Sequence, residues 1–232
     1  MENSKILLQY ALDALTEANI CKDLWAVGGG TVLSHYYNHR LSKDIDIFIS
    51  DSQYLSLLSP RFNNMTENAL DYNEMAKYIS LTYPEGKVDF IVGGQITSHF
   101  PIKSSFFDNM VYIEDPVEIV CKKLFYRGDQ ILPRDIFDLA VVFDSKRQND
   151  LIEALATIPK EFTVFAKKFS TIKNIPLYSN TYTNMLLETG KHYIGKEVLL
   201  CSDLINSLNE KLHKKIQTEV SETLEEENDY QR

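Results

Sequence analysis

The sequence has few of the features that mark secreted, disulfide-stabilised or membrane-spanning proteins. Its three cysteines, Cys21, Cys121 and Cys201, are an odd number at wide spacing, which argues against a disulfide framework or a zinc cluster and favours a reducing compartment. The uncharged stretches are too short to span a bilayer, and no small-residue cleavage site follows the N-terminal apolar segment. We therefore expect a soluble cytoplasmic protein without a membrane partner.

Charge is distributed unevenly along the 232 residues, although the 44% hydrophobic and 25% charged composition is ordinary for a globular protein. The net charge of −9 divides into −8 for residues 1–144, +4 for 145–216 and −5 for 217–232. This predicts a core over 1–144, a C-terminal lobe over 145–216 and an acidic, flexible tail over 217–232. The excess of cations in 145–216 fits either a face that contacts a phosphate backbone or an ordinary solvated helical surface.

The N-terminal half has the pattern of an α/β structure. A short apolar run at 24–27 meets three glycines and then a helical segment, and DIDIFI at 44–49 alternates charged and apolar residues as a strand does. The segments 76–83 and 87–92 flank Pro-Glu-Gly, which predicts a hairpin. A capping-box pattern starts a helix that runs over 116–127. Further helices are expected at 134–144, 148–157, 161–172, 182–190 and 196–215, which makes the fold class α+β with a helical C-terminal half.

Three aspartates stand in predicted strands. Asp44 and Asp46 are two residues apart, so they share one face of their strand, about 6.5–7 Å apart, and a hard divalent cation such as Mg²⁺ would explain why they are together. Asp89 lies in the apolar strand KVDFIV, and the three carboxylates would converge if that strand lies beside 44–49. The simpler alternatives are an exposed strand face for the pair and an edge strand for Asp89.

The glycines Gly28, Gly29 and Gly30 lie between a strand and a helix, where backbone N–H groups at a helix start can bind an anion. Such a turn can also be only a turn, and Thr31 can be simply the N-cap of the helix. An anion-binding turn followed at once by an acid pair is typical of a site for phosphate and a divalent cation.

Two adjacent lysines in the helix over 116–127 have different predicted roles. Lys122 follows Glu118 by four residues, which predicts a surface ion pair. Lys123 has Arg127 four residues later, and two cations on one face favour an anion between them. We therefore expect Lys123 to be the phosphate ligand and Lys122 to be structural.

The next helix carries two acids on one face, Asp135 and Asp138. Asp135 can be explained as the counter-ion of Arg127 or Arg134. Asp138 is surrounded by apolar residues, so we expect it to have a function.

In combination these segments resemble the AbiEii/AbiGii toxin family of the nucleotidyltransferase superfamily, which has a DNA polymerase β-like core. The resemblance covers residues 24–144 and depends on GGTVLSHYYNHRLSKDIDIF (29–48), KVDF (87–90) and EIVCKKLFYRGDQILPRDIFDLA (118–140). It implies a mixed or antiparallel sheet with helices.

The resemblance also implies roles for individual residues. Gly29 and Gly30 would form the nucleotide-phosphate turn, with Ser42 beside the phosphates. Asp44 and Asp46 would bind metal, and Asp89 would be the third acid. The second half of the site would contain Lys123 and Asp138. Gly28 is a departure from the superfamily's usual glycine-serine turn, so a serine contact to the triphosphate would be made by Thr31 or lost.

The implied activity is transfer of a nucleoside monophosphate from an NTP to an acceptor, with Mg²⁺, or alternatively Mn²⁺, neutralising the leaving pyrophosphate. The family's association with toxin–antitoxin and phage-defence modules favours tRNA or another RNA as the acceptor and a cognate antitoxin as a partner. A protein or small-molecule acceptor is the alternative within the same chemistry. A catalytically silent nucleotide-binding or interaction module is the alternative outside it.

Overall fold

The structure is a computed structural model that describes residues 2–175 and 183–230. These residues divide into two compact units, which we call the sheet unit (Met1–Lys122 with Tyr182–His192) and the helical unit (Lys123–Thr181 with Tyr193–Arg232). None of the described helices is both long enough and apolar enough to cross a bilayer.

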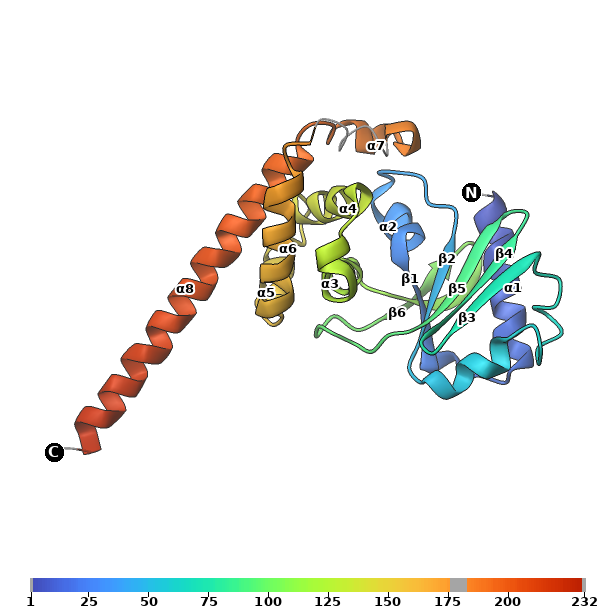
Figure 1. The fold of residues 1–232 in the computed structure, drawn as a ribbon, viewed down its shortest axis with the longest axis horizontal. Helices are drawn as coiled ribbons and strands as arrows, with labels where there is room; N and C mark the ends of the chain where they lie inside the picture. Colours follow the sequence, from blue (N-terminus) through green and yellow to red (C-terminus); the bar gives the residue numbers. More distant parts are fainter. Residues whose placement is uncertain (1, 176–182, 231–232) are drawn as a thin grey trace. The chain divides into compact units, whose positions relative to one another are not determined.

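The sheet unit contains one seven-stranded mixed sheet in the order β3-β4-β5-β2-β1-β7-β6 (Figure 1). Its strands are β1 (Trp25–Gly28), β2 (Ile45–Ile49), β3 (Asp71–Met75), β4 (Tyr78–Tyr83), β5 (Gly86–Val92), β6 (Ile102–Phe106) and β7 (Asn109–Ile113). Strand β2 is parallel to β5, and β1 is parallel to β7, whereas all other neighbours are antiparallel. The helical elements of this unit are α1 (Glu2–Glu17), η1 (Lys22–Leu24), α2 (Gly29–Tyr37), η2 (Ser52–Leu58), η5 (Thr183–Met185), α7 (Glu188–Lys191) and the first part of α3 (Pro116–Arg127).

The two faces of the central strands differ in chemistry. Ile45, Ile47 and Ile49 of β2 are fully buried on the face that α1 covers, where α1 contacts β2 and β5. The alternate residues Asp46 and Phe48 lie on the opposite face because side chains alternate along a strand. The apolar face therefore supplies the core, and the other face is left for polar side chains.

The helical unit consists of α4 (Pro133–Phe143), α5 (Gln148–Leu155), α6 (Pro159–Ile172) and α8 (Glu197–Tyr230), together with η3 (Gly128–Gln130) and the end of α3. Helix α8 packs against α4 and α5 through Cys201, Leu204 and Leu208, which are fully buried, and Cys201 Sγ lies 3.5 Å from the Ile136 carbonyl oxygen. The expected α+β class and the helical character of the C-terminal half are confirmed, as is the hairpin of β4 and β5.

The boundaries differ from the expected division into 1–144, 145–216 and 217–232. The two units divide within α3, between Lys122 and Lys123, because α4 packs with α8 rather than with the sheet. The segment expected as a flexible tail continues α8 as helix to Tyr230. Residues 217–230 contain neither glycine nor proline and are rich in glutamate, so nothing in them ends a helix that has already started. Residues 231–232 of that tail lie outside the described residues.

The expected helix over 182–190 is two short pieces, η5 and α7, and residue 182 lies outside the described part. These pieces pack on the loop that follows α2. The Leu187 N–H donates to the His39 carbonyl at 3.1 Å, and the Leu41 N–H donates to the Met185 carbonyl at 2.7 Å. A β-carbon on Gly190 would lie 1.8 Å from the His39 carbonyl oxygen, so this contact depends on glycine.

Candidate active site

The turn between β1 and α2 is built as a backbone anion site. Helix α2 starts at Gly29, and its N-cap residue, Gly28, has no side chain that could cap it. The first N–H groups of a helix have no partner within the helix, and together with the helix dipole they favour an anion. Gly29 has a φ of +69°, a left-handed conformation that side-chain-bearing residues rarely adopt.

Each glycine of the turn leaves space that a neighbouring functional group occupies. A β-carbon on Gly29 would lie 1.7 Å from Asp46 Oδ2. One on Gly28 would lie 2.3 Å from Glu114 Oε2 and 2.7 Å from the Phe48 ring. The third glycine, a departure from the superfamily pattern, is therefore required by the side chains that pack over it.

Asp46 and Asp89 lie side by side on the polar face of the sheet. They are register partners on the parallel strands β2 and β5, which are about 4.8 Å apart in such a sheet. Asp89 Oδ1 is buried, and no group in the described residues hydrogen-bonds to it. Burial, reinforced by the nearby Asp44 carboxylate, raises the pKa of Asp89, and a hydrogen bond from Ser80 opposes this. The expected adjacency of the two strands is confirmed.

Asp44 is held at the start of the same strand by two hydrogen bonds. Its Oδ1 accepts from the Lys87 N–H at 3.1 Å, and its carbonyl oxygen accepts from the Thr31 hydroxyl at 2.5 Å. Thr31 is 3% exposed and lies inside α2, so it is neither the helix N-cap nor an available donor to a triphosphate. Its hydroxyl instead ties α2 to the segment that carries Asp44.

The three aspartates do not form a closed metal site. Within residues 2–175 and 183–230, no group of three or more His, Cys, Asp or Glu side chains is arranged to hold a metal ion. Asp46 is directed to Gly29 and Asp44 to the start of β5, so the expected convergence is limited to the Asp46–Asp89 pair with Asp44 nearby.

These residues nevertheless fit Mg²⁺. Mg²⁺ retains several waters and is commonly bound by one or two carboxylates together with substrate phosphates, rather than by an all-protein cage. The carboxylate of Asp46 against Gly29 and that of Asp44 at the start of β5 supply oxygen ligands of this kind, and the buried, unpartnered Asp89 Oδ1 lies beside Asp46.

Two further polar groups lie at the turn. A β-carbon on Gly30 would lie 2.9 Å from Ser42 Oγ, so the expected position of Ser42 beside the phosphate turn is consistent with the structure. It would also lie 2.8 Å from a terminal nitrogen of Arg40, which is 2% exposed. Sequence reasoning missed Arg40. The arginine in HRLSKDID, so close to the acid pair, was the available signal.

Glu114 and Lys122 form a buried ion pair on the polar face of the sheet. Lys122 Nζ donates to Glu114 Oε1, lies 3.5 Å from Glu118 Oε1 and stands 4.3 Å from the centre of the Phe48 ring. The predicted pairing with Glu118 is confirmed, but the surface location is wrong, because Lys122 is 4% exposed. Burial raises the pKa of Glu114 to about 7, and Lys122 opposes the shift only in part. Glu114 Oε2 is buried and has no hydrogen-bond partner among the described groups.

Lys123 and Asp138 belong to the helical unit, where they form a buried network. Lys123 Nζ lies 2.5 Å from Asp138 Oδ2 and 2.9 Å from Asp135 Oδ1, and Arg127 lies 2.6 Å from Asp135 Oδ1. Lys123 and Arg127 thus do share an anion, as their spacing predicted, and in this structure that anion is the carboxylate of Asp135. The alternative that Asp135 neutralises Arg127 is confirmed.

A sequence profile of the family described as "Nucleotidyl transferase AbiEii toxin, Type IV TA system" matches residues 11–229. The chain belongs to this AbiEii family. No curated protein sequence matches it.

Three solved structures resemble this AbiEii chain. A nucleotidyltransferase from H. pylori has a TM-score of 0.47 at 15% identity, covering 91% of this chain and 96% of that one. The toxin MenT4 from Mycobacterium tuberculosis H37Rv has a TM-score of 0.46 at 13% identity, covering 86% and 84%. The antibiotic-resistance factor ANT(2'')-Ia has a TM-score of 0.42 at 14% identity, covering 76% and 96%.

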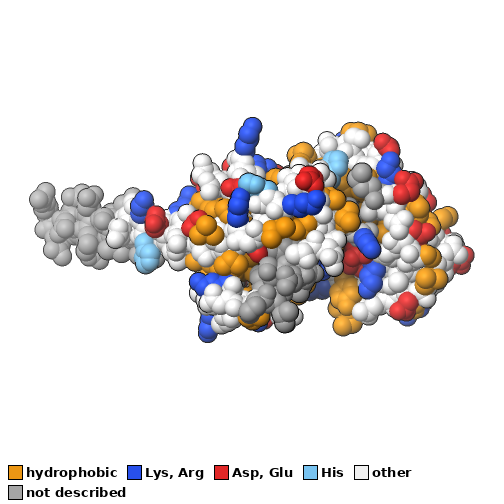
Figure 2. Space-filling view, turned by 90° about the horizontal axis from the view of Figure 1, so that it is seen from above, with side chains coloured by type: hydrophobic (Ala, Val, Ile, Leu, Met, Phe, Trp, Pro, Cys, Tyr) orange, Lys and Arg blue, Asp and Glu red, His pale blue; other side chains and the backbone are white. Residues whose placement is uncertain are grey.

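Membership in the AbiEii family defines the general activity. The chain is a nucleotidyltransferase enzyme and a toxin of the toxin–antitoxin type, so its substrate is an NTP and its counterpart is a cognate antitoxin. On the face of this AbiEii protein seen in Figure 2, Lys and Arg side chains are separated by apolar and uncharged surface rather than gathered into one basic patch.

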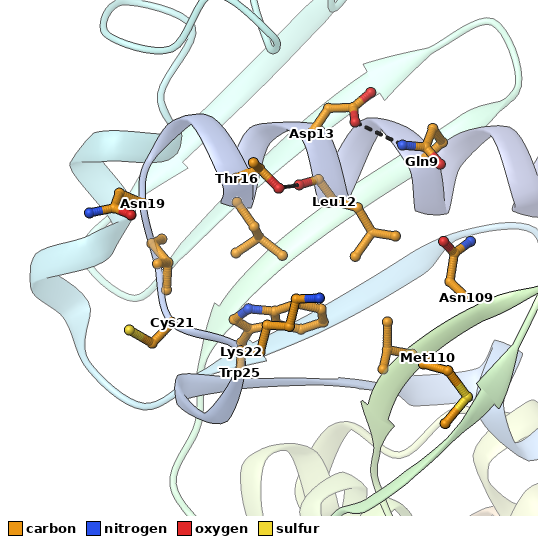
Figure 3. Close-up of a pocket in the computed structure, with 13 residues that line it drawn as sticks. Gln9, Leu12, Asp13, Thr16, Asn19, Cys21, Lys22, Trp25, Asn109 and Met110 are labelled. Atoms are coloured by element: carbon orange, nitrogen blue, oxygen red, sulfur yellow. Dashed lines mark hydrogen bonds between the residues drawn. The ribbon is translucent and has the colours of Figure 1, made fainter.

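One cavity of the AbiEii chain lies on the α1 side of the sheet, away from the carboxylates. It has a volume of about 460 Å³ and lies between α1 and residues 109–111, with Trp25 among its lining residues (Figure 3). Trp25 pairs with Ile49 of β2, whose side chain faces α1, whereas Asp46 lies on the other face. This cavity is therefore separate from the candidate active site.

Proposed function

We propose that the chain is a metal-dependent nucleotidyltransferase that moves a nucleoside monophosphate from an NTP to a hydroxyl group of an RNA, with tRNA as the favoured acceptor. The single observation that carries the proposal is the register that puts Asp46 beside Asp89, with Asp46 against Gly29 at the start of α2. A carboxylate pair next to an anion-binding turn is what transfer from a metal-bound triphosphate requires.

In this proposal the turn binds the triphosphate. The N–H groups of Gly29 and Gly30 and the hydroxyl of Ser42 donate to phosphate oxygens, and the Arg40 guanidinium adds positive charge at Gly30. Asp44 and Asp46 hold Mg²⁺ or Mn²⁺, with Asp89 as the third acid. The ion, when bound, neutralises charge on the triphosphate and on the leaving pyrophosphate.

Asp89 has the properties of a proton acceptor for the attacking hydroxyl. Its Oδ1 lacks a hydrogen-bond partner within the described chain, and its raised pKa makes it a stronger base than an ordinary aspartate. In the proposed step Asp89 Oδ1 takes the proton while the acceptor oxygen forms a bond to the α-phosphorus. The bond between that phosphorus and the bridging oxygen breaks, and pyrophosphate leaves with its electron pair.

Lys123 and Asp138 are proposed members of the nucleotide site on the strength of the family resemblance. Lys123 would bind phosphate as a point charge, and Asp138, 2.5 Å from its Nζ, would fix the position of the ammonium group. RNA as the acceptor is supported by the +4 balance of residues 145–216, since cations favour a phosphate backbone.

The test is incubation of the full chain with each labelled NTP, Mg²⁺ and total tRNA. We expect label in tRNA with the wild type, and a loss of at least about 100-fold in Asp46→Asn. Asp71→Asn is the matched control, because Asp71 is an exposed strand aspartate of β3 in the same sheet. Absence of label from tRNA with all four NTPs, or full activity in Asp46→Asn, contradicts the proposal.

The two alternatives give different results in the same experiment. If label enters a protein or a small molecule and this labelling is lost in Asp46→Asn, nucleotidyl transfer is supported and the RNA acceptor is overturned. If NTP stabilises the chain in a Mg²⁺-dependent manner but no nucleotide is transferred to RNA, protein or small molecules, the chain is a catalytically silent nucleotide-binding module.

A further inference from the structure

A second cavity, of about 390 Å³, opens on the carboxylate-bearing side of the sheet. Its volume lies in the range of small-molecule sites. Ala26 and Phe48 are register partners on this face, and Asp46 is the next residue of β2 on the same face. Tyr112 lies on this face too, because its neighbours Val111 and Ile113 are buried on the other one.

The cavity is lined by aromatic side chains and by a buried ion pair. Phe48, Phe100 and Tyr112 line it together with Glu114 and Lys122, which are 1% and 4% exposed. The Lys122 ammonium covers the Phe48 ring, and Trp25, which also lines the cavity, is only 5% exposed, so Tyr112 and Phe100 are the better placed rings for a ligand to contact. Phe100 is 68% exposed, as expected of a side chain at an open rim rather than in a core.

The loop that carries Phe100 is anchored, so the cavity is formed without a ligand. Glu118 of α3 accepts hydrogen bonds from the N–H groups of Ile96 and Thr97, at 2.9 and 2.8 Å, and from the Thr97 hydroxyl at 2.7 Å. The Gln95 amide donates to the carbonyls of Thr97 and His99. A preformed pocket of this kind binds a ligand with little ordering cost.

Two carboxylate side chains are among the polar residues that line the cavity. Glu114 Oε2 has no hydrogen-bond partner among the described atoms, and Asp23 adds a second carboxylate. Nucleobases are flat rings that carry amino or imino N–H donors. Such rings fit a site in which hydrogen-bond acceptors lie between aromatic side chains.

The cavity adjoins the proposed reaction site. Phe48 is two residues from Asp46, and Glu114 lies against Gly28, the register partner of Asp46. We infer that this cavity binds a nucleobase, which stacks on Tyr112 and Phe100. A role for this bound base in nucleotidyl transfer rests on the proposed function. The base can belong either to the NTP or to the terminal nucleoside of the RNA acceptor.

The test is binding of adenosine, guanosine, cytidine and uridine to the full chain in EDTA, measured by saturation-transfer NMR and titration. EDTA and the absence of phosphates remove any contribution from the metal and the triphosphate turn. We expect at least one nucleoside to bind, and Phe100→Ala and Tyr112→Ala each to weaken it about fivefold or more, the usual effect of losing one stacking contact. Phe62→Ala is the matched control, because Phe62 is 72% exposed and does not line the cavity.

Two results overturn the inference: no nucleoside binds the wild type, or both cavity variants bind like the Phe62→Ala control. If the wild type binds nucleosides but shows no transfer with any of the four NTPs, the proposed function is refuted and the cavity assignment stands. In an active enzyme, a raised KM for the NTP in Phe100→Ala assigns the base to the donor, and a raised KM for RNA assigns it to the acceptor.

Discussion

The Oδ2 atom of Asp46 occupies the space where a side chain of Gly29 would begin, 1.7 Å from an ideal β-carbon. The glycine thus serves two purposes, since it supplies the positive φ that starts α2 and it admits the carboxylate to the helix N-terminus. The proposed phosphate turn and the proposed metal-binding acid are therefore one structural element, although sixteen residues of sequence lie between the two positions.

This relationship predicts that Gly29→Ala abolishes activity. The substitution forces Asp46 to move and strains a φ of +69°, a cost of about 1–3 kcal/mol, so we expect a lower melting temperature and loss of stabilisation by Mg²⁺ with NTP. Thermal denaturation with and without ligands measures both effects. Gly195→Ala is the control, because it strains a similar φ of +77° while a β-carbon there meets nothing within 4 Å, so it should keep the stabilisation by ligand. Wild-type stabilisation by ligand in Gly29→Ala would contradict the role of this turn.

Asp89→Asn should separate stability from activity. Removing a carboxylate that is buried with an unpartnered oxygen and lies near two other acids should raise the free energy of unfolding in the absence of metal by about 1 kcal/mol. Transfer should fall by about 100-fold or more, since an amide cannot accept the proton. Urea denaturation and the incorporation assay measure the two effects. A variant that is destabilised but fully active would refute both assignments.

Glu114 should make stability depend on pH. Its pKa is about 7 in the folded chain and near 4.5 when unfolded, so the folded state binds more protons between these values. The stabilisation is fully present below pH 4.5 and is lost as the pH rises through 7, by an amount on the order of 3 kcal/mol. In Glu114→Gln the decline between pH 5 and 7.5 should become shallower, as measured by urea denaturation at each pH. Glu67→Gln, at an exposed glutamate, should retain the wild-type decline, and equal slopes in all three proteins would argue against this origin.

Lys123→Met should destabilise the helical unit by about 3–5 kcal/mol, because it removes the ammonium group that pairs with two carboxylates that are 0% exposed. Adding Asp138→Asn to this variant should recover part of the loss. Urea denaturation followed by circular dichroism measures the effect, with exposed Lys146→Met as a control that should stay within about 0.5 kcal/mol of the wild type. A loss below about 1 kcal/mol for Lys123→Met would show that the pairing contributes little.

Local patterns predicted the elements of the candidate site better than its contacts. The two-residue period of DIDIFI predicted which face of β2 is polar, and the i, i+4 spacing predicted that Lys122 pairs with Glu118. The burial of Lys122 was not predictable, because Phe48 of β2 and Glu114, which directly follows β7, are brought to it by the order of strands in the sheet. Arg40 was missed for a similar reason, since its position at Gly30 depends on the path of the loop between α2 and β2.

The two neighbouring lysines of α3 contribute to different ion networks because consecutive side chains point about 100° apart around a helix axis. Lys122 therefore pairs with carboxylates of the sheet unit, whereas the next residue, Lys123, pairs with carboxylates of the helical unit. An insertion or deletion of a single residue upstream in α3 would turn both lysines by about 100° about the helix axis, so neither would keep its present partners, whereas a substitution on the solvent side of the helix would leave both ion networks intact. The length of this helix is therefore under tighter constraint than its composition.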